Sequence, residues 1–160
     1  MHVFGVPTDE REELAQLQAA SNERRPPWWH RYREVVTFSY EQIIAFEDAA
    51  ESVSEFQLGL LPGLVQTEDY ARAVTGVGFA SLGPDQVEGL VEVRMVRQRK
   101  RLLETENPIR CHYLISQAAL EFRVGGEDVY RRQLQHLLDL CDHPSLTMQV
   151  IPYDRGEEAC

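Results

Sequence analysis

The sequence has few cysteines, no long apolar stretch and no surplus of positive charge, and each shortage argues against a class of protein. Cys111, Cys141 and Cys160 are odd in number and far apart, which disfavours the disulfide framework of a small secreted protein and favours free thiols. No apolar run approaches the roughly 20 residues that cross a bilayer, and the N-terminus lacks a basic-then-apolar signal pattern. We therefore expect a cytoplasmic protein without a membrane partner.

The shortage of positive charge bears on nucleic-acid binding. The chain has 26 acidic and 16 basic side chains, which gives a formal net charge of −10. Affinity for DNA depends largely on Lys and Arg contacts with phosphates, so an acidic surplus opposes it. We expect this chain by itself not to bind duplex DNA at physiological salt.

Motifs of catalysis and metal binding are also missing. His112 follows Cys111 directly, and His143 lies two residues after Cys141, so neither pair has the spacing of a zinc site. The nucleophile elbow and the zinc-protease helix motif are both absent from the sequence. We expect no metal, no cofactor and no catalytic residue, hence a protein that is not an enzyme, although a triad assembled in space stays open.

The most informative stretch runs from residue 58 to residue 74. Pro62 and Gly63 are the pairing expected at the centre of a type II turn, in which Gly63 would have a positive φ. Thr67 is a good N-cap, and two acidic residues follow it in the first helical turn. A helix should therefore begin at Thr67, with Tyr70 on the face that packs back onto the preceding apolar run.

Two elements are expected before this stretch. Residues 40–50 have the spacing of an amphipathic helix with a solvated acidic face. Residues 53–60 alternate like a half-buried strand, with Phe56, Leu58 and Leu60 on the buried side.

After the central helix, Gly76, Gly78 and Gly83 predict a loop. A new helix should begin at Pro84 and continue to Leu103, with acidic residues early and basic residues late, as the helix dipole favours. Two interpretations of the basic end stay open. It grips a phosphate or an acidic partner, or it is a solvated face paired with the acidic surplus of the chain.

The second half of the chain changes period. Residues 109–115 and 146–153 alternate as strands, and residues 127–142 have helical spacing between them. A strand, a helix and a strand connected in this way predict a crossover between parallel strands. The expected fold class is α+β, mostly helical, with a small mixed sheet that includes one strand-helix-strand crossover.

The N-terminal part predicts a short helix over residues 8–21 and a polar, proline-containing linker up to residue 27. Trp28 and Trp29 then form an aromatic cluster beside basic residues. Such a cluster either anchors the first helix to the domain or offers a stacking or cation–π surface.

Four blocks of sequence, in the same order, resemble a domain of unknown function that follows XRE-type helix-turn-helix modules in actinobacterial transcriptional regulators. The first, Leu61-Pro62-Gly63-Leu64-Val65-Gln66-Thr67-Glu68-Asp69-Tyr70-Ala71-Arg72-Ala73, is the most recognisable. The others are the helix end with Arg94, Arg97 and Gln98, the run from Ala118 to Leu138 with its Val-Gly-Gly turn, and Leu146 to Tyr153, which ends in proline and an aromatic residue.

The resemblance implies a role in transcription. The DNA-reading helices would lie upstream of Met1, so residues 1–27 would be the tail of that region plus a linker. Residues 28–160 would form the C-terminal regulatory domain, with an incomplete C-terminal sheet edge. The implied function is a non-enzymatic effector- or partner-binding domain, antitoxin-like in some relatives, whose partner is a small protein encoded nearby or a small-molecule effector.

These considerations give a set of candidate binding residues: Trp28, Trp29, Pro62, Gly63, Gln66, Thr67, Tyr70, Arg97 and Gln98. The alternative from another functional class is an enzyme that acts on a small molecule in a pocket between the crossover helix and the N-terminal helices. The oligomeric state stays open, with a homodimer among the options.

Overall fold

The computed structural model describes residues 26–78 and 82–155, so the helix expected over residues 8–21 lies outside the described residues. The chain divides into two compact units, Met1–Arg31 and Tyr32–Cys160. In the described part of the first unit, Trp28 and Trp29 belong to a 3₁₀ helix, η1 (Trp28–Tyr32), and their rings are perpendicular with centroids 5.6 Å apart.

The second unit contains a three-stranded sheet in the order β1-β2-β3, formed by β1 (Ser52–Gln57), β2 (Arg110–Ser116) and β3 (Leu146–Ile151). Both neighbouring pairs are parallel, so the crossover from β2 to β3 is confirmed. The α+β class is also confirmed, although the sheet is parallel throughout rather than mixed.

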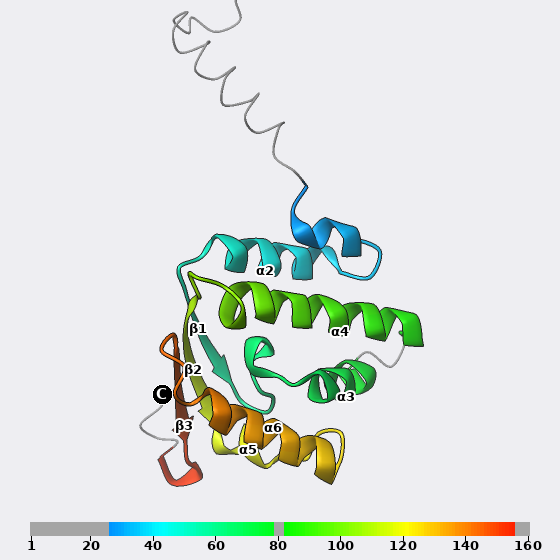
Figure 1. Ribbon diagram of the computed structural model, residues 1–160. Helices are drawn as coiled ribbons and strands as arrows, with labels where there is room; N and C mark the ends of the chain where they lie inside the picture. Colours follow the sequence, from blue (N-terminus) through cyan, green and yellow to red (C-terminus); the bar gives the residue numbers. More distant parts are fainter. Residues whose placement is uncertain (1–25, 79–81, 156–160) are drawn as a thin grey trace, which may run out of the picture. The chain divides into compact units, whose positions relative to one another are not determined.

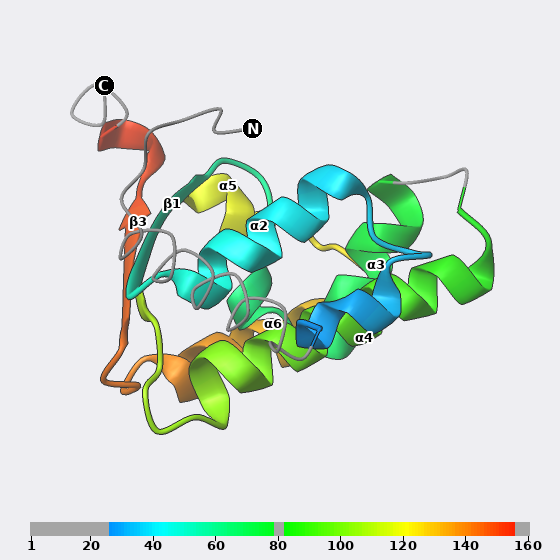
Figure 2. The same ribbon diagram turned by 90° about the horizontal axis from the view of Figure 1, so that it is seen from above.

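The helices lie on one side of this sheet, as the two views of Figures 1 and 2 show. None of the helices in the described part of the chain has the length and apolar character that a membrane span requires. The helical elements are α2 (Phe38–Ala49), η2 (Gly63–Val65), α3 (Glu68–Gly78), α4 (Pro84–Gln98), the π-helical turn η3 (Arg99–Leu103), α5 (Gln117–Glu121) and α6 (Glu127–Leu140).

The hydrophobic core lies between the sheet and these helices. The central strand β2 supplies Cys111, Tyr113 and Ile115, each at most 2% exposed. The residues just before and within α3, among them Leu64 and Tyr70, pack into the same cluster. The stretch singled out by the sequence therefore lies at the centre of the fold.

The expected alternation of β1 is wrong in phase. Phe56 is 54% exposed and Leu58 is 67% exposed, whereas Val53, Glu55 and Gln57 are half-buried on the side of the helices. Apolar alternation predicts the wrong buried face for this strand. Its polar side chains Glu55 and Gln57 face the helices, where they line a cavity.

Two expectations about glycine are also wrong. The described glycines with positive φ are Gly125 and Gly126, which precede α6, so Gly63 does not occupy a type II turn. Gly63 instead begins the 3₁₀ helix η2 after Pro62. Gly76 lies within α3, because the central helix continues further than the glycines suggested.

Candidate functional site

The segment between β1 and α3, residues 61–67, is fastened to the fold by buried glutamines. The Gln66 side chain donates from Nε2 to the Leu61 carbonyl at 2.7 Å. Gln98, at the end of α4, donates to the carbonyls of Leu64 at 2.7 Å and Gln66 at 3.0 Å. Both glutamines are at most 5% exposed, so their amides satisfy backbone groups that water does not reach.

A third glutamine reaches the same segment from α6. Gln133 is fully buried, donates to the Val65 carbonyl at 2.8 Å and accepts from the Thr67 N–H at 2.6 Å. The Thr67 hydroxyl accepts from the Tyr70 N–H at 3.4 Å, which confirms the expected N-cap of α3. The Tyr70 hydroxyl accepts from the Leu61 N–H at 3.3 Å. This segment is therefore held in one conformation by side chains from distant helices.

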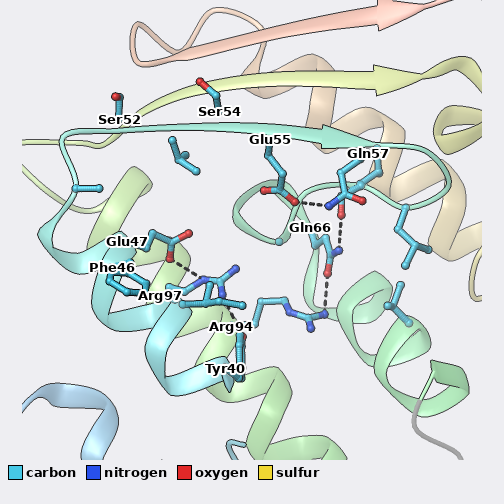
Figure 3. A pocket seen from close by; sticks show the side chains of 17 residues that line it. Tyr40, Phe46, Glu47, Ser52, Ser54, Glu55, Gln57, Gln66, Arg94 and Arg97 are labelled. Carbon is cyan, nitrogen blue, oxygen red and sulfur yellow. Dashed lines mark hydrogen bonds and ion pairs between the residues drawn. The ribbon is translucent and has the colours of Figure 1, made fainter. Parts of the chain in front are cut away.

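A cavity of 660 Å³ opens beside this segment, between α2, β1 and the second half of α4 (Figure 3). This volume is within the range of small-molecule pockets in proteins. The lining combines polar groups with apolar side chains. Its residues are Tyr40, Ile43, Phe46, Glu47, Ala50, Ser52, Val53, Ser54, Glu55, Gln57, Leu60, Leu61, Gly63, Gln66, Val74, Arg94 and Arg97.

The deepest charged groups of the cavity are Glu47 of α2 and Arg97 of α4. Their side chains are 11% and 8% exposed, and Glu47 Oε2 lies 3.0 Å from Arg97 Nε, in ion-pair contact but without the alignment of a hydrogen bond. The Arg97 guanidinium also lies over the Tyr40 ring, 5.5 Å from its centroid, and donates to the Tyr40 hydroxyl at 3.3 Å. A Cβ at Gly63 would lie 2.4 Å from Arg97 Nη2, so glycine is needed there for space rather than for φ.

The pKa of Glu47 is raised above its ordinary value because burial disfavours the carboxylate more than the nearby guanidiniums of Arg97 and Arg101 favour it. Desolvation of the Glu47 carboxylate therefore outweighs its attraction to these guanidiniums. The ion pair connects α2 to α4 beside the cavity.

A second polar group lies one turn earlier on α4. Arg94 donates from Nη1 to Gln66 Oε1 at 2.8 Å, which connects α4 to the fastened segment. On the opposite wall, Gln57 donates from Nε2 to Glu55 Oε1. Figure 3 shows these side chains on either side of the opening.

Apolar side chains form the outer part of the lining. Ile43 is 54% exposed, Phe46 74% and Leu60 40%. The sequence placed the apolar residues of α2 on a buried face, yet of these Ile44 alone is fully buried, at 1%. A cavity that combines buried polar groups with exposed apolar side chains suits a ligand that has both kinds of surface.

The structure separates the candidate residues into three groups. Gly63, Gln66 and Arg97 line the cavity. Pro62 and Thr67 belong to the fastened segment, and Tyr70 and Gln98 bond to its backbone from α3 and α4. Trp28 and Trp29 belong to the other unit and are not among the lining residues.

Several lining residues are not among the candidates that the sequence indicates. Arg94 carried a usable signal, because residues three apart lie on one face of a helix and Arg97 was already a candidate. Glu47 carried none, since a carboxylate on a polar helix face is expected to be solvated. Of the two interpretations of the basic end of α4, the solvated face is wrong at Arg97, because this side chain is 8% exposed and pairs with Glu47 of another helix.

Residues 40–160 match the family described as Domain of unknown function (DUF5753). The chain belongs to this family. Tyr40 is both the first matched residue and the first residue of the cavity lining, so the DUF5753 domain contains the whole cavity. A search of curated proteins and a search of solved structures returned no match.

Proposed function

We propose that the DUF5753 domain of this chain is the effector- or partner-binding part of an XRE-family transcriptional regulator, and that it is not an enzyme. The observation that carries the proposal is the cavity, which combines buried, mutually held charges with an exposed apolar rim. Its ionised side chains are engaged with one another or with amides, an arrangement that suits recognition of a ligand.

Two further observations support this reading. The four sequence blocks that resemble the regulator-associated domain include the segment fastened beside the cavity and the helix end with Arg94 and Arg97. The net charge of −10 suits a domain that leaves contact with DNA to a separate helix-turn-helix module. The partner is then a small-molecule effector or a small protein encoded nearby, as in antitoxin-like regulators.

A ligand screen tests the proposal. The full chain is screened by thermal shift against a metabolite library and by pull-down against small proteins encoded beside its gene. A bound ligand stabilises the folded state by mass action, so the melting temperature should rise with its concentration. Arg94→Ala should weaken the response, whereas Arg131→Ala, on the exposed face of α6, should leave it unchanged.

The screen also addresses the enzymatic alternative. Conversion of a bound compound by the full chain, lost in Arg94→Ala, would favour an enzyme and contradict our proposal. A response in which Arg94→Ala and Arg131→Ala behave alike would remove the cavity as the binding site.

A further inference from the structure

The outer edge of β1 borders the cavity. β1 is an end strand of the described sheet, and β2 lies on its inner side. The Arg110 N–H donates to the Glu51 carbonyl at 3.0 Å, so the backbone of Glu51 faces β2. Because backbone groups of alternate residues in a strand point to the same side, those of Ser52, Ser54 and Phe56 point away from β2.

The cavity reaches this backbone edge. Its lining includes Ser52 and Ser54 as well as Val53 and Glu55, which lie on the opposite face of the strand. In Figure 3 the side chains of Ser52 and Ser54 point away from the cavity, so these residues border it through their backbone. No backbone partner for the outward N–H and C=O groups of Ser54 occurs in the described part of the chain.

We propose that this site binds an extended peptide segment of a protein partner, which adds a strand to the outer edge of β1 and directs alternate side chains into the cavity. A free strand edge beside a lined hollow is the arrangement by which sheets recognise extended peptides, with backbone hydrogen bonds for affinity and the hollow for specificity. The inference rests on the proposed function, because it names the partner class of the same cavity.

The lining indicates which side chains the peptide carries. Phe46 and Ile43 are 74% and 54% exposed at the rim and form an apolar surface that an apolar side chain of the peptide can contact. The Glu55 carboxylate receives a hydrogen bond from a neutral amide, that of Gln57, and pairs with no cation among the described residues. Arg94 and Arg97, by contrast, are already held by Gln66 and Glu47.

The partner segment therefore carries a basic and an apolar side chain on the same face, two residues apart, as the pleat of a strand requires. The net charge of −10 on this chain also favours a basic partner over a second copy of the same chain, since two such copies repel each other.

The test uses the full chain and a displayed library of random dodecapeptides. We expect enrichment of peptides that carry a basic and an apolar residue two positions apart, so that both side chains lie on the same face of the added strand. In NMR spectra of the complex with a selected peptide, the amide protons of Ser54 and Phe56 should become protected from exchange. Those of Val53 and Glu55, which face β2, should change little.

Two variants of one residue separate strand addition from other modes of binding. Ser54→Pro removes the outward N–H but no bond to β2, and proline is tolerated on edge strands, so it should weaken peptide binding by about tenfold or more. Ser54→Ala keeps the N–H and should bind like the natural chain. Urea unfolding of both variants checks that the fold is retained.

Glu55→Gln tests the recognition of charge. This variant should bind basic peptides with less preference, and its peptide binding should depend less on salt.

Other results would overturn the inference. These are equal binding by Ser54→Pro and Ser54→Ala, protection of the Ser54 amide before any peptide is added, or a dimeric mass for the free chain with this edge buried. If small molecules bind the cavity and no peptide does, strand addition fails and the effector-binding function stands. If neither binds, both proposals fail.

Discussion

Two groups of charged side chains in the second unit differ in burial and in number of contacts. Glu47 and Arg97 form one ion pair beside the cavity, with side chains 11% and 8% exposed. Arg72 of α3 is 36% exposed and contacts three carboxylates at the surface. These belong to Glu68, Asp69 and Glu88, at 2.7, 3.3 and 2.7 Å.

The number of ionic contacts that a side chain makes does not measure how strongly the stability of the fold depends on it. Exposed pairs are screened by water and salt and contribute about 0–1 kcal/mol. Burial of Glu47 costs desolvation energy, which its raised pKa reflects. Loss of one partner of a buried pair leaves the charge of the other without compensation in the interior. The single buried pair should therefore respond more strongly to mutation than the surface cluster does.

The largest effect is expected for Arg97→Leu. This change removes the ion-pair partner of the buried Glu47 carboxyl and the guanidinium that packs on Tyr40. We expect a loss of about 3–5 kcal/mol in the free energy of unfolding, measured by urea denaturation at pH 7.5.

Two controls bear on the cause of that loss. The double variant Glu47→Leu with Arg97→Leu removes both charges and should regain most of the stability. A carboxyl with a raised folded pKa contributes stability at low pH that is lost as pH rises above its ordinary value of 4.5. In Arg97→Leu this dependence should steepen, so the variant should lose less stability at pH 5 than at pH 8. A loss independent of pH would assign the effect to packing alone.

The next largest effect is expected for Gln133→Ala. The change strips the Val65 carbonyl and the Thr67 N–H of their partner, and each buried unsatisfied group costs about 1–3 kcal/mol. We expect a loss of about 2–4 kcal/mol in urea denaturation. Gln135→Ala, on the same helix, removes one exposed bond to Asp139 and should cost less than about 0.5 kcal/mol. Equal losses would mean that the fastened segment does not depend on Gln133.

These contrasts also show what could be predicted from the sequence. The start of α3 after Thr67, the helix from Pro84 and the crossover between β2 and β3 follow from capping, charge placement and period, which act within a few residues. Local chemistry therefore gave the elements and the fold class.

The cavity could be predicted only in part. Gly63, Gln66 and Arg97 came from a recognisable pattern, but the reason given for Gly63 was wrong, because the atom that requires glycine is on α4. The inward phase of Glu55 was missed because a strand beside a polar cavity does not follow apolar alternation. Such features depend on contacts between distant segments, about which local patterns carry no information.

A smaller effect is expected for Gly63→Ala. The new methyl group would meet the Arg97 guanidinium, which must move away from it. Overpacking costs about 1–3 kcal/mol, and we expect the lower end because the displaced atom is at the tip of a side chain. Gly76→Ala is the matched control, since its Cβ meets nothing within 4 Å in α3, and it should stabilise the protein by about 0.4–1 kcal/mol. Destabilisation of similar size in both would point to backbone conformation instead.

The smallest effect is expected for Arg72→Ala, although this residue has the most ionic contacts. Its carboxylate partners are 47–62% exposed, so water replaces the lost contacts and the cost should stay below about 1 kcal/mol.

Because the cluster lies at the surface, even this difference should shrink in 0.5 M salt, where screening shortens the range of charge interactions to roughly 4 Å. The loss in Arg97→Leu should keep its size under the same conditions, since salt does not reach the buried pair. Urea denaturation of both variants at low and high salt measures the difference. If Arg72→Ala cost as much as Arg97→Leu, or if both losses fell equally with salt, burial would not be what separates the two groups.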